Sequence, residues 1–268
     1  MGENNLSESR SVKISVITVC YNSEHTIEDT ICSILNQTYK DVEHVIVDGA
    51  STDGTQQVVT RYRDRLAQAI SEPDRGIYDA MNKGILLATG DVVGTLNADD
   101  VYADETVLEQ VAAIFSDPAV DACYADLVYV SADDTTRVRR YWRSCSYREG
   151  LFERGWMPAH PTFFVRRRVY EEHGLFDTQF KLQSDFELTM RFINVQRIKT
   201  VYTPRIWVRM RMGGVSNRSI RNVMRGNIEA YKACRKHGIK VSPLFFLTKI
   251  ASRIPQFFMW PPAESDPA

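Results

Sequence analysis

Short apolar strands and amphipathic helices alternate through the first 115 residues, and this alternation constrains the fold more than any other feature. Strands are predicted where β-branched and apolar residues run together: KISVITVCYN from Lys13, VEHVIVDGA, residues 66–71 and DVVGTLNADD. Helices are predicted over residues 26–36, from Asp53 or Thr55 onward, and over 77–88. This order predicts an α/β protein whose open, mostly parallel, Rossmann-like sheet is flanked by helices.

The pattern becomes irregular after residue 120. Strands are predicted near residues 122–130, 162–165 and 199–212, and helices near 166–172, 185–192 and 219–237. No stretch has the composition of a linker. A length of 268 residues favours one large domain, or one domain with a small appendage, over two separate cores.

Polar residues follow the predicted strands. Because ligands of open parallel sheets bind at the carboxyl ends of the strands, these residues are expected along one rim. They are Asn22, Asp48, Asp74, Asp99 and Asp100.

The LNADD segment is the most informative of these strand ends. Adjacent carboxylates repel each other and lose solvation at a rim, so a cation or a helix N-terminus should compensate Asp99 and Asp100. Asp104 and Glu105 lie closer to the next helix and can cap it, which favours a divalent cation. Such an ion would bridge the diphosphate of a nucleotide and take up its charge as it leaves.

Charge is divided between the two halves. Residues 1–136 contain 24 acidic and 8 basic residues, whereas residues 137–268 contain 10 acidic and 25 basic ones. The acidic half fits a divalent cation held by carboxylates. The basic half suits phosphates, a membrane surface or nucleic acid, unless it is solvated surface charge folded against the acidic half.

The segment VDGASTDGT combines a strand end with a tight turn. Gly49 and Gly54 permit the turn, and Asp48 could accept hydrogen bonds from a nucleobase or ribose, although the segment could also be a turn alone. A phosphate-binding P-loop is excluded because Thr55 stands where lysine is needed. No G-x-G-x-x-G follows a predicted strand, which argues against a dinucleotide-dependent dehydrogenase.

Two further segments carry candidate functional residues. In DRGIYDAMNKG, a helix opening at Gly76 has one polar face, which is either solvated or part of the rim; it contains Tyr78, Asp79, Asn82 and Lys83. In the basic half, Asp185 and Glu187 begin a helical run as caps or as functional carboxylates. His160 is either an acceptor-binding group or a core histidine.

The order of these motifs resembles a known enzyme family. T-V-C-Y-N, V-D-G-A-S-T-D-G-T, D-R-G-I-Y-D-A-M-N-K-G, L-N-A-D-D, H-P-T-F-F and S-D-F-E-L-x-x-R together are similar to the family 2 inverting glycosyltransferases of the GT-A fold, of the bacterial polysaccharide-assembly type. The resemblance covers about residues 12–215. It implies a nucleotide-sugar half over 12–115, an acceptor half over 116–215, and a C-terminal helical segment over 216–260.

The resemblance also implies roles for residues. Asp48 would bind the nucleoside with Val19 and Tyr21 near the base, Asp100 would hold Mn²⁺ or Mg²⁺, and Asp99 would contact the ribose, donor sugar or metal. Asp185 would be the catalytic base with Glu187 as second candidate, and His160 would contact the acceptor. The other expected donor-site residues are Asn22, Asp79, Asn82 and Lys83.

The expected reaction is one metal-dependent displacement by a hexosyltransferase. A sugar moves from a nucleotide-sugar, UDP being the first choice, to a hydroxyl of a glycan or of a polyprenyl-diphosphate-linked sugar, and nucleic acid is not an expected partner. Two alternatives remain: a non-catalytic sugar-nucleotide binding module, and a nucleotidyltransferase. The second would need a glycine-rich basic loop after the first strand, and TVCYNSEHT is neither.

The C-terminal run PLFFLTKIASRIPQFFMW mixes aromatic residues with Lys249 and Arg253. This composition predicts either a helix at an anionic membrane surface or one packed on the core or on a second subunit. The five cysteines form no C-x-x-C pair, and the chain shows no signal peptide and no apolar run of spanning length. We therefore expect a cytoplasmic protein, at the inner face of the plasma membrane if the run is interfacial.

Overall fold

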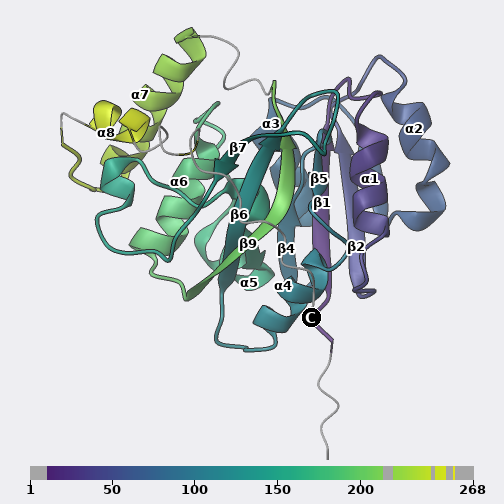
Figure 1. Ribbon diagram of the computed structural model, residues 1–268, viewed down its shortest axis with the longest axis horizontal. Coiled ribbons are helices and arrows are strands. Elements are labelled where there is room, and N and C mark those ends of the chain that lie inside the picture. Colours follow the sequence, from purple (N-terminus) through teal and green to yellow (C-terminus); the bar gives the residue numbers. More distant parts are fainter. Residues whose placement is uncertain (1–10, 214–219, 243–244, 252–255, 257–268) are drawn as a thin grey trace, which may run out of the picture.

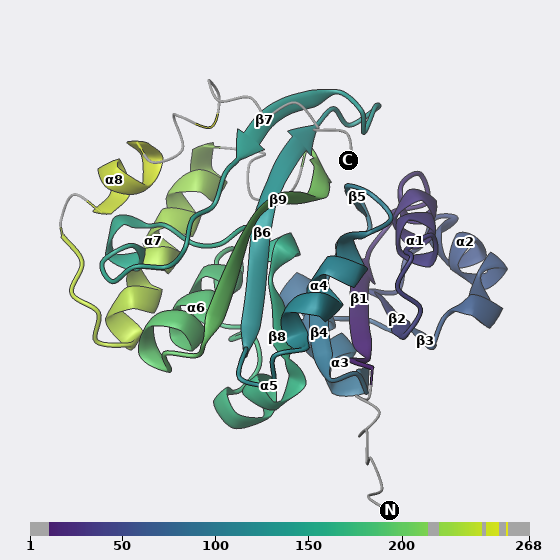
Figure 2. The ribbon, with the colours of Figure 1, turned by 60° about the horizontal axis from the view of Figure 1, so that its bottom comes forward.

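The computed structural model contains a mixed sheet of order β3-β2-β1-β4-β8-β6-β9-β5, with β7 paired to β6 (Figures 1 and 2). The structure describes residues 11–213, 220–242, 245–251 and 256. Its strands are β1 (Ile14–Cys20), β2 (Val42–Asp48), β3 (Gln68–Ser71), β4 (Val92–Thr95), β5 (Asp100–Tyr102), β6 (Ala122–Val130), β7 (Val138–Trp142), β8 (Phe164–Arg166) and β9 (Thr200–Arg211). Its α-helices are α1 (Ile27–Leu35), α2 (Thr55–Arg61), α3 (Ile77–Leu87), α4 (Val107–Phe115), α5 (Arg167–His173), α6 (Ser184–Met190), α7 (Ile220–Lys236) and α8 (Phe245–Ala251).

The first half of the sheet is parallel, as predicted. β1 pairs in parallel with β2 and β4, and β2 pairs in parallel with β3. Every residue of β1 is buried, and so is every residue of β2 except the first. Strands covered on both faces read as uninterrupted apolar runs, which is why the sequence identified them.

Helices cover both faces of this parallel part. Ile17 of β1 packs in one core cluster with Met81 of α3, whereas Ile46 of β2 packs in another with Ile31 of α1. Gly84 is needed where α3 crosses β1, because a Cβ at this position would overlap the Ile17 side chain. Helices thus bury both faces of the parallel strands, and the polar side chains lie at the ends of the strands.

The second half differs from the prediction of a mostly parallel sheet. β8 is antiparallel to β4 and β6, β7 is antiparallel to β6, and β5 is antiparallel to β9, while β6 and β9 are parallel. Two strands, β5 and β7, were not predicted. β5 has three residues and begins at an aspartate, and arginines interrupt the apolar pattern of β7, VRRYW.

The C-terminal helices lie on the side of the molecule far from α2 (Figures 1 and 2). Phe245 of α8 is fully buried, with its ring centroid 6.4 Å from that of Phe186 and 6.5 Å from that of Tyr231. Lys249 is also buried. Phe245 and Lys249 of the predicted interfacial run therefore pack on the core, whereas Leu247 of the same helix is 64% exposed. Residues 243–244, 252–255 and 257–268 lie outside the described residues. Among the described helices, none is long and apolar enough to cross a membrane.

Glu43 fastens the edge of the sheet opposite the strand carboxyl ends. Its buried carboxylate pairs with the Lys13 ammonium at 2.6 Å and accepts hydrogen bonds from Ser15 Oγ (2.5 Å) and from Thr89 N and Oγ1 (2.5 and 2.6 Å). Burial alone would raise the pKa of this carboxyl, but the bonds from Lys13, Ser15 and Thr89 outweigh it and lower the pKa from 4.5 to about 2. The folded state therefore stabilises the charged form of Glu43.

We predict that Glu43→Gln destabilises the protein at neutral pH by roughly 3 kcal/mol, because the folded-state pKa of Glu43 is depressed. The contribution of this group is fully present above the unfolded pKa of 4.5 and is lost as pH falls toward 2. The difference in melting temperature between the two proteins should therefore narrow as the pH falls from 7 to 3. Glu149→Gln is the control, since both partners of its ion pair with Arg197 are 78% exposed. Equal melting temperatures for wild type and Glu43→Gln at pH 7 would contradict the prediction.

Candidate active site

The carboxyl ends of β1, β2 and β3 lie together, as the parallel register requires. Cys20 is opposite Asp48, and Asp48 is opposite Ser71. The loops that follow are joined by hydrogen bonds from Asn22 N to Ser51 Oγ (2.8 Å) and from Thr52 N to Asn22 Oδ1 (2.9 Å). The predicted rim therefore exists, and Asn22 holds two of its loops together.

Asp48 shapes this rim from within. It is 3% exposed, and its carboxylate accepts hydrogen bonds from Ser51 N (3.1 Å), Ser51 Oγ and Ser71 Oγ (2.6 Å). Val19 is also buried, in the main core cluster. Neither side chain presents appreciable surface in this structure. The binding of the nucleoside by Asp48, with Val19 near the base, stays a prediction.

Tyr21 and Asp74 are the more accessible groups at this point: Tyr21 is exposed and Asp74 is partly exposed. The Tyr21 side chain is 62% exposed. A Cβ on Gly49 would overlap Asp74 Oδ2 and would lie 3.5 Å from the Tyr21 ring, so the two side chains flank the same glycine. Asp74 Oδ1 accepts the Gly76 N–H at 2.7 Å, which orients its carboxylate. Asp74 was predicted at the rim, but its approach to Gly49 was not readable from the sequence.

The polar residues of α3 divide into anchors and one site residue. Asp79 pairs with Arg75 (2.8 Å), Lys83 pairs with Glu72 (2.7 Å), and Asn82 exchanges two 2.9 Å hydrogen bonds with the backbone of Phe176. In the present structure these three side chains are therefore engaged in holding neighbouring segments. Tyr78 differs, because its hydroxyl donates a 3.0 Å hydrogen bond to Asp185 Oδ1 across 107 positions of sequence.

Asp185 and His160 form the centre of the candidate site with Tyr78. His160 Nδ1 lies 3.4 Å from Asp185 Oδ2, and Asp185 Oδ1 also accepts the Phe186 N–H at 2.8 Å. The Asp185 side chain is 15% exposed, so solvent or a ligand can reach it. Burial, reinforced by the nearby Asp185 carboxylate, raises the pKa of Tyr78 well above its ordinary value, and Tyr78 stays a proton donor.

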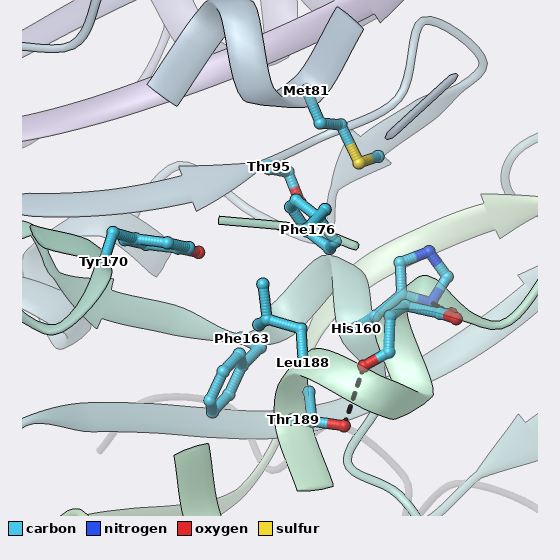
Figure 3. Close-up of a pocket in the computed structure, with 9 residues that line it drawn as sticks. Met81, Thr95, His160, Phe163, Tyr170, Phe176, Leu188 and Thr189 are labelled. Atoms are coloured by element: carbon cyan, nitrogen blue, oxygen red, sulfur yellow. Dashed lines mark hydrogen bonds and ion pairs between the residues drawn. The ribbon is translucent and has the colours of Figure 1, made fainter. Parts of the chain in front are cut away.

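A small, mainly apolar cavity lies behind His160. It is lined by side chains of α3, β4, α5 and α6 and of the segments between them (Figure 3): Met81, Thr95, Phe163, Tyr170, Phe176, Leu188 and Thr189. Burial lowers the pKa of His160 below its ordinary value, and the carboxylates of Asp185 and Asp99 oppose this shift. The imidazole is therefore neutral at neutral pH and can both donate and accept a hydrogen bond.

The two aspartates of LNADD have different surroundings. Asp100 is completely buried, and its carboxylate accepts hydrogen bonds from Asn97 Nδ2 (3.2 Å) and Arg211 N (3.3 Å). Asp99 is partly exposed and lies close enough to Arg211 and His160 to interact with them electrostatically. Burial raises the pKa of Asp99, and the interactions with Arg211 and His160 oppose the shift. Asp99 is thus the member of the pair that faces the candidate site, whereas a metal on Asp100 would require that side chain to turn outward.

Glu187 lies outside the site, contrary to its ranking as the second candidate base. It is 1% exposed and is held by Arg191 Nε (3.0 Å) and His237 Nε2 (2.6 Å). Burial raises the pKa of Glu187, but the bonds from His237 and Arg191 outweigh burial and lower it. Glu187 therefore ties α6 to the carboxyl end of α7.

Comparison with known proteins agrees with this arrangement. Residues 15–174 match the profile described as glycosyl transferase family 2, so the chain belongs to that family. A "PGL/p-HBAD biosynthesis glycosyltransferase" of Mycobacterium bovis (strain BCG / Pasteur 1173P2) is 29% identical over 192 residues, which cover 70% of this chain and 72% of the relative. The protein is a glycosyltransferase, and this favours the enzyme over the binding module and the nucleotidyltransferase.

Two solved structures show the same fold. The S. aureus TarS 1–349 complex with UDP has a TM-score of 0.61 and 19% identity, and the match covers 85% of this chain and 67% of the TarS 1–349 chain. The mannosyltransferase PcManGT of Pyrobaculum calidifontis, in complex with GDP-Man and Mn²⁺, has a TM-score of 0.64 and 22% identity, and the match covers 91% and 69%. The expected GT-A fold is confirmed.

Proposed function

We propose that this glycosyltransferase moves a hexose, with inversion, from a nucleotide-sugar to a hydroxyl of a glycan or of a polyprenyl-diphosphate-linked sugar in polysaccharide assembly. The observation that carries the proposal is the partly exposed Asp185 carboxylate, fixed by Tyr78 and placed beside a neutral His160. A carboxylate held in this way suits a general base, since one oxygen is anchored and the other faces the imidazole.

The reaction consists of one displacement. Asp185 takes the proton of the acceptor hydroxyl while that oxygen forms a bond to the anomeric carbon of the donor. The bond between this carbon and the diphosphate breaks, and the nucleoside diphosphate leaves from the opposite face with the electron pair. Tyr78 keeps Asp185 oriented. Because the pKa of Tyr78 is raised, its phenol stays protonated and cannot take the proton of the acceptor hydroxyl.

The donor is assigned to the rim of the parallel strands. Tyr21 and Asp74, which flank Gly49, offer an aromatic face and a carboxylate acceptor to a base. Asp48 and Asn22 shape the loops beneath them. UDP remains the first donor to test; TarS is bound to UDP and PcManGT to GDP-Man, so the neighbours include two different bases.

A divalent cation fits this rim with Asp99 as its ligand. In the described part of the chain, no group of three or more histidine, cysteine or acidic side chains is arranged to hold a metal. Mg²⁺ and Mn²⁺ sites in phosphate chemistry commonly use one or two carboxylates and complete the shell with phosphate oxygens and water. When bound, the ion would neutralise the charge that develops on the departing diphosphate. Asp99, partly exposed near His160, is better suited to hold it than buried Asp100.

We propose that α7 makes the membrane contact. The side chains of Met224 and Ile228 are 60% and 44% exposed, and exposed Arg221 and Arg225 lie one turn away on the same helix. Apolar side chains flanked by arginines favour an anionic surface such as the inner leaflet of a plasma membrane. This would bring the enzyme to a lipid-linked acceptor.

We predict that Asp185→Asn lowers the transfer rate by about 10²- to 10⁴-fold and leaves UDP affinity unchanged, because the amide cannot accept the proton. Glu187→Gln, two positions away on the same helix, should affect stability and not turnover. It should cost on the order of 3 kcal/mol of stability, since Arg191 and His237 lose their buried partner, and should retain turnover while folded. Transfer rates, UDP affinities and melting temperatures of both variants test this. Wild-type turnover by Asp185→Asn would remove Asp185 as the base.

We predict that Asp99→Asn abolishes the difference in UDP affinity measured with and without Mn²⁺, because it removes the accessible carboxylate. Asp100→Asn should keep the metal dependence, and Asp79→Asn serves as a control for losing a carboxylate elsewhere at the rim. Equilibrium titrations with UDP, with Mn²⁺ or with EDTA, measure the effect. Metal dependence that survives in Asp99→Asn and disappears in Asp100→Asn would restore Asp100 as the ligand.

We predict that Met224→Ser combined with Ile228→Ser weakens binding to anionic vesicles by roughly tenfold, because less apolar area enters the interface. Leu86→Ser is the matched control, since this side chain is 72% exposed but lies on α3 in the acidic half. Cosedimentation with phosphatidylglycerol vesicles measures the partition. Equal loss of binding in the double variant and in Leu86→Ser would contradict a role for α7.

A further inference from the structure

A second cavity also reaches His160 and Asp185. It lies between the β6–β7–β9 part of the sheet, α7 and α8, and has a volume of about 100 Å³. The smaller cavity of Figure 3 has a volume of about 20 Å³, which is room for one water molecule. Of these two cavities, only the larger can therefore receive a sugar ring beside the proposed base.

The two cations that line the larger cavity build its walls. Nε and Nη2 of Arg140 both donate to Oε1 of Gln256, and Nζ of buried Lys249 donates to Oε1 of Gln183 at 2.7 Å. These donors already have partners in the protein. Asp185, which also lines the cavity, would repel an anion placed against it. The groups that remain for recognition therefore suit an uncharged ligand.

Trp142 of β7 offers this cavity a flat apolar face and an N–H group. Its ring is parallel to that of Tyr129 within 5°, with centroids 6.4 Å apart, and Trp142 pairs with Leu127 of β6. Part of its surface is accessible, and among the described residues its indole N–H has no hydrogen-bond partner. The apolar face of a pyranose ring can pack on the indole, while the N–H donates to a hydroxyl.

Asn227 of α7 offers an amide to the same cavity. Its side chain is half-buried and has no hydrogen-bond partner within the described part of the chain. An amide has both donors and an acceptor, so it can pair with two neighbouring hydroxyls of a sugar. An aromatic face together with a small number of placed polar groups is typical of a site for a small neutral ligand.

We propose that this cavity is the acceptor subsite and that it takes a neutral hexopyranose. Trp142 receives one face of the ring, Asn227 and the indole N–H pair with hydroxyls that do not react, and the reacting hydroxyl lies against Asp185. The proposal rests on the proposed transfer reaction and adds the class of acceptor and the side chains that select it.

Binding to the full-length protein tests the subsite without requiring turnover. The probes are the methyl α-glycosides of glucose, galactose and mannose, and α-glucose 1-phosphate, each titrated in the presence of UDP and Mn²⁺. The wild type should bind at least one methyl hexoside. The phosphate should bind no more tightly than methyl glucoside, because the cations of the lining are engaged. Binding of none of the three hexosides, or a preference of about tenfold or more for the phosphate, would overturn the proposal.

Variants of the two side chains distinguish this subsite from the sugar position of the donor. Asn227→Ala should weaken the bound hexoside about fivefold, because one hydrogen-bonding group is lost, and alanine favours the helix more than asparagine does. Trp142→Phe loses the N–H and keeps a ring, so it should also cost about fivefold, whereas Trp142→Leu loses both and should cost about tenfold or more.

The matched control is Lys232→Ala. Lys232 is an exposed residue of α7 that does not line the cavity, so this variant should bind the hexoside as the wild type does. UDP affinity should be the same in all variants, and melting temperatures show whether each is folded. Equal hexoside affinity of Lys232→Ala, Asn227→Ala and Trp142→Phe would overturn the subsite.

The neutral ring can be the end of a glycan or the sugar of a lipid-linked acceptor. Val223 lines the cavity, is 38% exposed and precedes Met224 of the proposed membrane contact. The octyl glycoside of the bound hexose, used below its micelle concentration, is a probe for the lipid-linked form. Binding tighter than that of the methyl glycoside, and lost in Val223→Ser, would assign the site to a lipid-linked sugar. Equal binding of the two glycosides would assign it to a glycan.

Transfer assays separate the fate of the subsite from that of the proposed reaction. Hexoside binding that depends on Trp142 in a protein that transfers no sugar would keep the subsite and overturn the reaction. Transfer with an unchanged acceptor KM in both Trp142→Leu and Asn227→Ala would keep the reaction and overturn the subsite.

Discussion

Everything in this structure depends on the parallel pairing of β1 with β2 and β4, because this pairing brings the carboxyl ends of the strands to one edge. The buried polar groups of loops that lie side by side at such an edge must form hydrogen bonds with one another. Asp48 does so through Ser51 and Ser71, and Asp100 does so through Asn97 and the backbone of Arg211. Because Asp48 and Asp100 are buried in these contacts, the side chains that stay accessible at this edge are Tyr21, Asp74 and Asp99.

The sequence predicted the parallel half well because burial on both faces produces apolar runs that mark each strand. β5 and β7 escaped prediction for the opposite reason. β7 is interrupted by arginines, and β5 is too short to show a pattern. Their pairing depends on partners distant in the chain, such as Met210 for Asp100, and no local signal specifies such a partner.

The candidate site shows the same limit at the level of single side chains. Asp185 and Glu187 are indistinguishable as acidic residues in the first turn of one helix. Their surroundings differ because Tyr78 arrives from α3 and His237 from the end of α7. The sequence identifies both carboxylates as candidates, but tertiary packing leaves Asp185 partly exposed and buries Glu187. Asp48 was nominated in the same way, and burial likewise turned it inward.

The hydrogen bond between Tyr78 and Asp185 has a consequence for recombination between relatives. Asp185, the proposed base, lies in the second half of the chain, whereas Tyr78, the phenol that orients it, lies in the first half. Asn82 adds two hydrogen bonds to the backbone of Phe176 between the same two halves. A chimera that joins the first half of one family member to the second half of another would inherit the base without its matched partner. Exchange of the halves as modules is therefore restricted to parents that share this cross-boundary contact.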